Sequence, residues 1–296
     1  MHREKASTKS KSSKPTEKKS RSSFLERIGS EADSDDVGFS IMLYGKEGVG
    51  KTSFAAFAPN PLFIVDSQEH GIHRLKKSRQ VPSGIAVGPD IETWDGLLAA
   101  LYEVQTSDHS FETVVIDSLT GMQRLCFKAC CDAEWQGDFT KEGFFAFNNG
   151  PKTAAQKYWP DFLQALTDLQ QQNINVILIG HSVIKPFQNP EGADYDRIIP
   201  DLDKAVDSIT KRWAGSVLYL KHNVDLSKVG QKMKASGGEQ RILCTEYDAA
   251  YDAKNSYGFP PLMEPFNSPK EGWDMFWSLL KKSTSDERPT KSKSRK

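Results

Sequence analysis

Eight consecutive residues of this chain form a glycine-rich segment that could hold a chain of phosphates. Residues 45–52 read Gly-Lys-Glu-Gly-Val-Gly-Lys-Thr and match the pattern G-x-x-x-x-G-K-[ST] completely. In this pattern the glycines turn backbone N–H groups toward phosphate oxygens, and the helix that follows adds its positive end. We therefore predict that the segment binds a nucleoside triphosphate. The predicted binding residues are Gly45, Lys46, Glu47, Gly48, Val49, Gly50, Lys51, Thr52 and Ser53.

Two residues of this loop and one acid downstream have the types that phosphoryl transfer requires. Lys51 would bridge the β- and γ-phosphates, and the Thr52 hydroxyl would ligate Mg²⁺. Asp117 follows the apolar run 114–116, so it is expected at the carboxyl end of a strand, beside the phosphate loop, where it would hold the same ion. An ordinary strand that ends in a capping aspartate is the alternative. The expected cofactors are ATP and Mg²⁺, with Thr52 and Asp117 on the metal side.

Hydrolysis also requires a group that orients or deprotonates the attacking water. Glu69 follows the strand-like run 61–66 and is the candidate, with Asp66 as a competitor and a solvated loop residue as the alternative. His181 follows the apolar run 174–179 and is predicted to sense the γ-phosphate and report it to the next loop. A histidine that merely satisfies a strand end is the other reading. The predicted catalytic residues are Lys51, Glu69, Asp117 and His181.

Short apolar runs alternate with helix-like stretches and would position these residues. The strand-like runs are 39–44, 61–66, 84–87, 111–117, 174–179, 216–220 and 241–245. The stretches with helical spacing are 52–58, 91–106, 119–135, 153–172 and 203–213. This alternation predicts an α/β fold, a mostly parallel sheet covered by helices on both faces. Gly237-Gly238 signals a turn, and hence antiparallel additions at one edge of the sheet.

Two stretches break this pattern, and both are rich in aromatic and basic residues. The first, 136–152, contains Phe144, Phe145 and Phe147 between Lys141 and Lys152. The second, 183–200, has three prolines and contains Lys185, Phe187, Gln188, Tyr195 and Arg197. Aromatic faces and cations together suit single-stranded DNA, because bases stack on rings while cations hold the backbone. The alternative is that the phenylalanines pack in a core or in a subunit interface.

Composition separates a folded body from two basic ends. Apolar residues make up 38% of the 296 residues and charged residues 26%, with a net charge of +0. Residues 1–37 and 281–296 are predicted to be disordered basic tails, either solvated or in contact with nucleic acid. The four cysteines lack metal-site spacing and are interpreted as reduced packing residues. With no apolar stretch for a membrane and no secretory signal, we expect a cytoplasmic protein.

The motifs resemble those of the RecA-like P-loop ATPases. Residues 45–52 match the Walker A motif and residues 114–118 match Walker B. Residues 63–71 resemble the strand that leads to the catalytic glutamate, here one residue longer, and residues 177–181 resemble the strand that ends in a sensor. Within this superfamily the chain is similar to the phage-encoded RecA-like ATPases associated with single-strand annealing proteins. Their sensor is commonly Gly-His, and the chain has Gly180-His181.

A late signature of that phage family is present in part. The family often carries Lys-Asn-Arg-x-x-x-Pro, and residues 254–260 read Lys-Asn-Ser-Tyr-Gly-Phe-Pro. Ser256 therefore stands where an arginine is often found. Lys254 and Arg241 remain as candidates for contacting the phosphates of a neighbouring subunit.

The resemblance implies an activity and partners. Residues 38–280 would form a RecA-like ATPase domain that binds single-stranded DNA and supports homologous recombination or strand annealing. ATP would lie at the interfaces of a homo-oligomer, a single-strand annealing or binding protein would be a further partner, and a bacterial host would be the setting. Two alternatives are a nucleotide-dependent assembly or replication accessory factor with little turnover, and a P-loop kinase. The kinase would need an arginine-rich lid, for which the sequence gives no signal.

Overall fold

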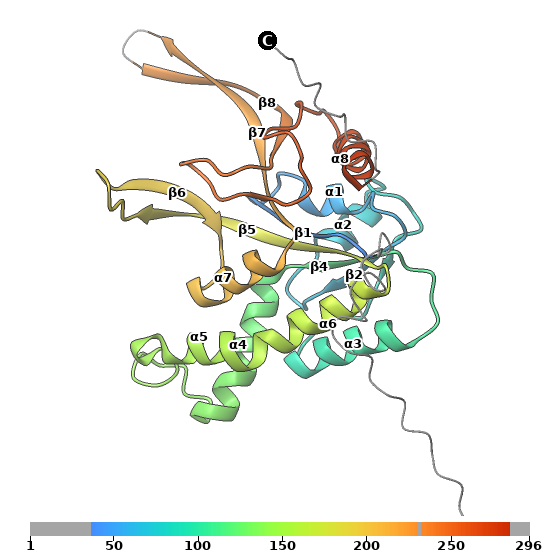
Figure 1. Ribbon diagram of the computed structural model, residues 1–296, viewed down its shortest axis with the longest axis vertical. Helices are drawn as coiled ribbons and strands as arrows, with labels where there is room; N and C mark the ends of the chain where they lie inside the picture. The colour runs from blue at the N-terminus through green and yellow to red at the C-terminus, as the bar shows by residue number, and fades with distance from the viewer. Residues whose placement is uncertain (1–36, 230–231, 285–296) are drawn as a thin grey trace, which may run out of the picture. The chain divides into compact units, whose positions relative to one another are not determined.

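A nine-stranded sheet forms the centre of the computed structural model, which describes residues 37–229 and 232–284 (Figure 1). The strands lie in the order β3-β2-β4-β5-β1-β7-β8, while β6 pairs with β5 and β9 pairs with β7. Pairing is parallel from β3 to β7 and antiparallel for β6, β8 and β9. The strands are β1 Ser40–Gly45, β2 Pro61–Val65, β3 Ala86–Val87, β4 Thr113–Asp117, β5 Asn175–Phe187, β6 Tyr195–Pro200, β7 Ser216–Val229, β8 Lys232–Cys244 and β9 Lys254–Asn255. The predicted α/β class is confirmed.

Helices cover both faces of this sheet. The helices are α1 Lys51–Ala55, α2 Gly71–Lys77, α3 Trp94–Thr106, α4 Leu119–Trp135, α5 Asn149–Thr153, α6 Trp159–Gln171, α7 Lys204–Trp213 and α8 Pro269–Thr284. A 3₁₀ turn, Ala146–Asn148, precedes α5, and a π turn, Ala154–Tyr158, joins α5 to α6. Buried side chains of α1, α2 and α8 share one hydrophobic core, and those of α3, α4, α6 and α7 share another. The two helix layers are visible on opposite sides of the strands in Figure 1.

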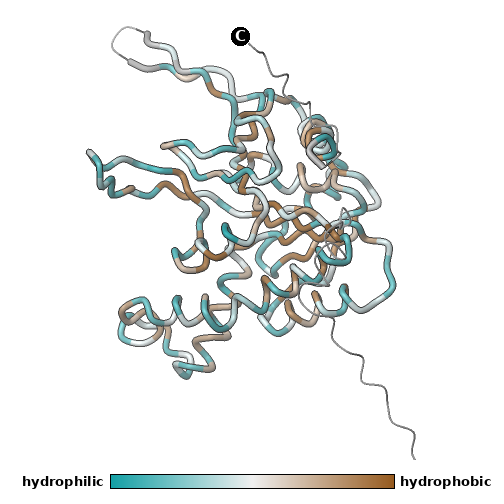
Figure 2. The backbone as a smooth tube through the Cα atoms, in the orientation of Figure 1, coloured by the Kyte–Doolittle hydropathy of each residue, from teal (hydrophilic) through white to brown (hydrophobic). Residues whose placement is uncertain are grey.

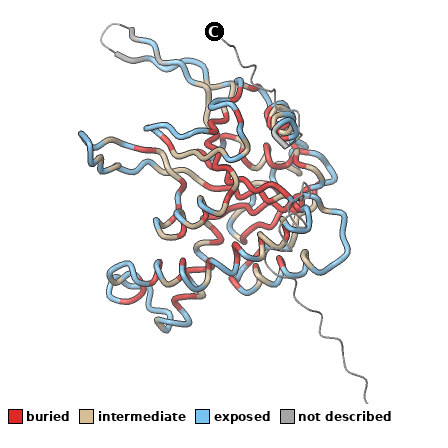
Figure 3. Tube along the Cα trace, in the orientation of Figure 1, coloured by how far each residue is buried: buried red, intermediate tan, exposed pale blue. Residues whose placement is uncertain are grey.

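The two cores exist because side chains alternate along each strand. In β1, Met42 and Tyr44 enter the core with α3, α4 and α6, whereas Ile41 and Leu43 enter the core with α1 and α8. The inner strands are therefore apolar at nearly every position, as expected of a parallel sheet buried on both faces. Figures 2 and 3 show this centre as the most hydrophobic and most buried part of the described chain.

Strand order brings the predicted site residues to one edge of the sheet. β5 lies between β1 and β4, with His181 opposite Gly45 of the phosphate loop strand and Ile179 opposite Asp117. All three strands are parallel, so their carboxyl ends meet at the same place. The fold thus places the phosphate loop, Asp117 and His181 side by side.

The stretch 183–200, predicted to be irregular, is instead a two-stranded ribbon. β5 continues past His181 to Phe187 and returns as β6, so the proline-based prediction was wrong here. Pro186 is tolerated because this part of β5 pairs only with β6, and its outer edge has no ladder in the described chain for the missing N–H group to join. Pro200 is the last residue of β6.

The last strands are also longer than predicted. β7 and β8 extend beyond the sheet as a second ribbon, and both ribbons project to the same side in Figure 1. Gly237 and Gly238 do not form the turn that their pairing suggested. They lie inside β8 at φ +83° and +96°, opposite a shift of register between His222 and Val224. The glycines therefore mark a β-bulge, which needs backbone angles that other residues rarely adopt.

Helix α8 has no counterpart among the predicted elements. Its start is capped reciprocally: Ser268 Oγ accepts from the Glu271 N–H at 3.2 Å, and the Glu271 carboxylate accepts from the Asn267 N–H at 2.8 Å. The helix runs to Thr284, so residues 281–284, assigned to the C-terminal tail, are helical. Residues 285–296 and 1–36 lie outside the described residues.

The cysteines, the division of the chain into units and the helices bear on three further predictions. All four cysteines are buried and free, as expected for packing residues. The described residues belong to one of the two units into which the chain divides, Asp36–Lys296, while Met1–Asp35 lies outside them. Within the described part, no helix combines the length and apolar character that crossing a membrane requires.

Candidate functional site

The predicted phosphate loop connects β1 to α1 and closes around its own lysine. Lys51 is buried, and its Nζ donates to the carbonyl oxygens of Gly45 at 2.8 Å and Lys46 at 3.0 Å. Burial lowers the pKa of Lys51, and the nearby Asp117 carboxylate opposes that shift. The ammonium is therefore held by carbonyl groups of the predicted phosphate loop.

The two predicted magnesium-side residues contact each other. Thr52 Oγ1 donates to Asp117 Oδ2 at 2.8 Å. Burial raises the pKa of Asp117 to about 6, although the hydrogen bond from Thr52 works against this. No group of three or more metal-ligating side chains occurs in the described residues. A hydroxyl with one carboxylate nevertheless fits Mg²⁺, which commonly takes one or two protein oxygens together with substrate phosphates.

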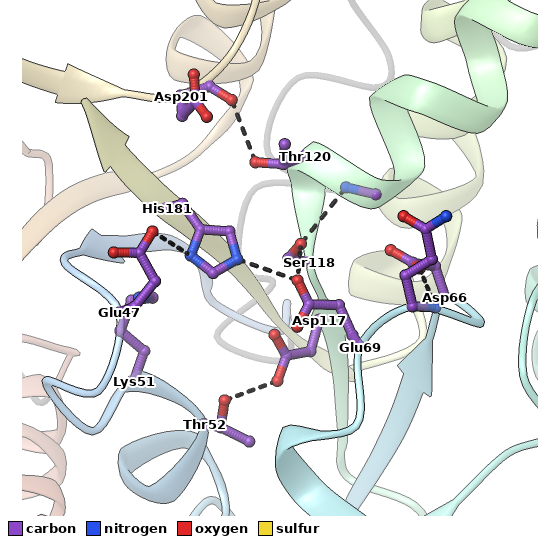
Figure 4. Close-up of polar contacts among 12 residues, drawn as sticks. Glu47, Lys51, Thr52, Asp66, Glu69, Asp117, Ser118, Thr120, His181 and Asp201 are labelled. Carbon is purple, nitrogen blue, oxygen red and sulfur yellow. Dashed lines mark hydrogen bonds and ion pairs between the residues drawn. The ribbon is translucent and has the colours of Figure 1, made fainter.

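Glu69 and His181 are far apart in the sequence and are joined by a hydrogen bond (Figure 4). His181 Nε2 lies 3.0 Å from Glu69 Oε1, and Ser118 Oγ donates to the same oxygen at 3.0 Å. On its other side, His181 Nδ1 lies 3.5 Å from Glu47 Oε1, an ion-pair contact that leaves this buried nitrogen without a hydrogen bond among the described residues. His181 therefore stands between a carboxylate of the phosphate loop and the predicted catalytic carboxylate.

The pair should make the stability of the fold depend on pH. The bond to Glu69 raises the pKa of His181 above its ordinary 6.5, and the bond to His181 lowers the pKa of Glu69 below its ordinary 4.5. The stabilisation of the fold by protonated His181 is complete below pH 6.5 and is lost as pH rises through the pKa of His181 in the folded state. The glutamate contribution is complete above pH 4.5 and is lost as pH falls. We expect His181→Gln to lower the free energy of unfolding, and to lower it most between about pH 4.5 and 6.5.

Urea unfolding of wild type and His181→Gln from about pH 5 to about pH 8 would test this expectation. The gap between the two unfolding free energies should narrow as pH rises. Two parallel curves would show that the pair does not titrate with folding.

Asp66, the competing acid, has a different position. It is only 1% exposed, and its Oδ1 accepts from the Gln68 N–H at 2.7 Å while its carbonyl oxygen accepts from the Glu69 N–H at 3.0 Å. Glu69 lines the cleft beside the phosphate loop, whereas Asp66 does not. Asp66 therefore shapes the turn that carries Glu69, and of the two acids only Glu69 can face a bound nucleotide.

The carboxylate of Asp66 packs directly on the backbone of α4 at Gly121. A Cβ built on Gly121 would lie 1.3 Å from Asp66 Oδ2, so any side chain there must displace the acid. We expect Gly121→Ala to lower the free energy of unfolding by about 1–3 kcal/mol. Gly84→Ala is the matched control, because nothing lies within 4 Å of a Cβ at Gly84. Urea unfolding measures the free energy of unfolding of both variants. Equally small losses in Gly121→Ala and Gly84→Ala would contradict this packing.

Two clefts meet at Glu69 and His181. The phosphate-loop cleft, of about 910 Å³, is lined by the predicted binding residues Glu47, Gly48, Gly50, Lys51, Thr52 and Ser53. The other three predicted residues, Gly45, Lys46 and Val49, do not line it and contribute backbone carbonyl groups to hydrogen bonds. A second cleft of about 800 Å³, here called the aromatic cleft, is lined by Phe127, Phe139 and Phe145. Gln68, Glu69 and His181 line both clefts, so they form a shared wall.

The phenylalanines of the stretch 136–152 differ in burial. Phe144 is fully buried against Phe127 and Trp135, with ring centroids 5.4 and 5.3 Å away, and is a core residue. Phe145 is 43% exposed in the aromatic cleft, and Phe147 is 91% exposed. Exposed rings are thus available for stacking, while Phe144 is not.

The cations of the β5–β6 ribbon also differ from one another. Lys185 lines the aromatic cleft. Arg197 is buried, bonds Asp252 at 2.7 Å, and lies 4.4 Å from the centre of the Tyr247 ring. Arg197 therefore has a structural partner and is not presented to a nucleic acid backbone.

Both candidates for a contact between subunits are engaged within their own chain. Arg241 Nε donates to the Val49 carbonyl at 2.8 Å, and Arg241 lines the phosphate-loop cleft. Lys254 Nζ donates to the carbonyl oxygens of Lys211 and Arg212 at the end of α7. Arg241 therefore belongs to the site of its own subunit, and Lys254 caps a helix.

Ser118 and Arg124 were not among the predicted site residues, and Arg241 was predicted only as a candidate for contacting a neighbouring subunit. The contacts of all three residues join segments that are distant in the sequence. Only Ser118 had a hint, since it directly follows the predicted metal-side acid.

A comparison with known protein families gave a match. Residues 38–257 match a family described as an AAA domain, a span that covers most of the chain and includes every predicted site residue. A search of curated proteins gave no match.

Proposed function

This chain belongs to the AAA domain family of nucleotide-binding P-loop ATPases, and we propose that it couples ATP hydrolysis to the binding of single-stranded DNA. Such coupling would support homologous recombination or strand annealing. The AAA domain accounts for the ATPase part of this proposal. The DNA part rests on the aromatic cleft and its shared wall with the phosphate-loop cleft.

On the nucleotide side, each residue has a defined task. Lys51 and the loop N–H groups hold the phosphates, and Thr52 with Asp117 would hold Mg²⁺, which neutralises charge on the transferring phosphoryl group. Glu69 orients the attacking water and accepts its proton. Glu69 is bonded to His181 and Ser118. A γ-phosphate that engages His181 would release the carboxylate for this task.

The aromatic cleft combines exposed rings with cations, the two features on which single-stranded DNA binding depends, although Asp66, Glu69, Asp132, Asp201 and Asp203 also line it. Phe139 and Phe145 are partly exposed there, and Arg124, Lys128 and Lys185 supply positive charge. Two acids of the cleft are engaged within the protein: Asp132 pairs with Lys128 at 2.6 Å, and Asp203 Oδ1 caps α7 by accepting from the Ala205 N–H at 2.9 Å.

One observation carries the proposal: the Glu69–His181 pair forms part of the wall of both clefts. An occupant of the aromatic cleft and a γ-phosphate would therefore act on the same hydrogen bonds. This gives a physical route by which DNA could change ATP turnover and ATP could change DNA affinity.

The decisive experiment measures ATP turnover by the pure protein with and without single-stranded DNA. Stimulation by DNA, together with weaker DNA binding by Phe145→Ala, is the expected result. Tyr102→Ala removes another exposed aromatic ring, from α3, and is the control that should bind DNA normally. Turnover that ignores DNA, with no DNA binding in the presence of ATP, would refute the DNA part of the proposal.

A further inference from the structure

We propose that the Arg124–Asp66 ion pair is the element through which a bound phosphodiester acts on Glu69, an inference that rests on the proposed DNA binding in the aromatic cleft. A DNA phosphate on Arg124 would compete with Asp66 for the guanidinium. Asp66 would then hold the turn of Glu69 less firmly, and the carboxylate would leave His181 more readily. Arg124 is thus a positioning residue that acts through Asp66.

Asp66 is bonded to the backbone of the turn that carries Glu69. Its side chain and its carbonyl oxygen bond the backbone N–H groups of Gln68 and Glu69, at 2.7 and 3.0 Å. It is packed against Gly121 so closely that its carboxylate has little freedom on that side. A change in the forces on this carboxylate must therefore be taken up by the turn that carries Glu69.

Arg124 reaches Asp66 from the side of the aromatic cleft. Its Nη2 lies 3.3 Å from Asp66 Oδ1, yet its side chain is 44% exposed whereas that of Asp66 is 1% exposed. A guanidinium has five N–H donors in a planar fork, and this contact is the one that Arg124 makes within the described residues. Arg124 lines the aromatic cleft, so its other donors could bond an anion bound there.

Lys128 provides a matched comparison on the same helix. It lies one turn beyond Arg124, lines the same cleft, and pairs with Asp132 at 2.6 Å rather than with Asp66. Both cations could attract a phosphate. Only Arg124 is connected to the turn of Glu69. Loss of Arg124 should therefore change how DNA stimulates ATP turnover, whereas loss of Lys128 should change only DNA affinity.

The test compares wild type, Arg124→Gln, Arg124→Lys and Lys128→Gln. DNA affinity is measured by fluorescence anisotropy with a labelled thymidine oligonucleotide, and ATP turnover is measured without DNA and at saturating DNA. In Arg124→Gln the ratio of stimulated to basal turnover should fall at least about fivefold. Arg124→Lys keeps the charge but lacks the fork, so it should bind DNA and still lose stimulation. Lys128→Gln should raise the half-saturating DNA concentration about two- to fivefold and keep the full ratio.

The outcomes separate this inference from the proposed function. If wild type binds no oligonucleotide, the proposed DNA binding itself fails. If DNA binds and stimulates wild type but the ratio is unchanged in Arg124→Gln, the coupling through Asp66 is refuted. A drop of basal and stimulated turnover by the same factor would also refute it, because that pattern indicates a purely structural role.

Discussion

Replacing Glu69 by glutamine is expected to lower ATP turnover about 100- to 1000-fold while ATP still binds. The amide has nearly the same shape as the carboxylate, but it cannot accept a proton from the attacking water. It can still accept hydrogen bonds from His181 and Ser118, which lie 3.0 Å from Glu69 Oε1, so the site should remain assembled. Steady-state turnover and binding of a fluorescent ATP analogue measure the two properties separately.

Glu92→Gln is the control, because this exposed glutamate lies on neither cleft. Its turnover should match that of wild type. Full turnover by Glu69→Gln would instead show that Glu69 is not the catalytic carboxylate. Little turnover by wild type itself would favour the alternative of an accessory factor.

Lys51→Ala is expected to weaken ATP binding at least about 100-fold and to abolish measurable turnover. The ammonium is the buried cation of the phosphate loop, and each hydrogen bond that it makes to a charged phosphate oxygen stabilises the complex by about 1.5–3 kcal/mol. Its replacement removes these bonds and leaves the phosphates unpaired. Titration with a fluorescent ATP analogue provides the measurement.

Loss of binding must be distinguished from loss of the fold. Without nucleotide, the Lys51→Ala protein should melt cooperatively. Lys77→Ala, at the end of α2, removes a lysine that lines neither cleft and should bind ATP normally. If Lys51→Ala binds ATP with wild-type affinity, the loop is not the phosphate site.

The parts of the site that the sequence could predict are the ones encoded locally. The phosphate loop is one continuous motif, and Asp117 ends a run of apolar residues on a strand that had to be buried. Glu69 and His181 were each identified from their own strands. Their mutual bond joins residues 112 positions apart, and no local pattern encodes such a contact.

The remaining features depend on contacts between distant segments or on signals that are weak in one sequence. Arg241 bonds a carbonyl 192 positions away, and Arg124 bonds an acid 58 positions away. The two ribbons have few buried positions, so hydrophobic alternation could not mark their full length. Helix α8 did have a signal, the Ser268–Glu271 capping pair ahead of Trp273 and Phe276.

The length of β5 has a mechanical consequence. A single strand begins in the centre of the sheet, passes the nucleotide site at His181 and ends at Phe187 in the ribbon. From His181 to Phe187 the chain extends about 20 Å, at about 3.3 Å per residue. Pairing with β6 stiffens this segment, so it should move as a rigid ribbon about its base at His181. A rotation of a few degrees at His181 would move Phe187 by about an ångström or more, while the pairing of β5 with β6 stays the same.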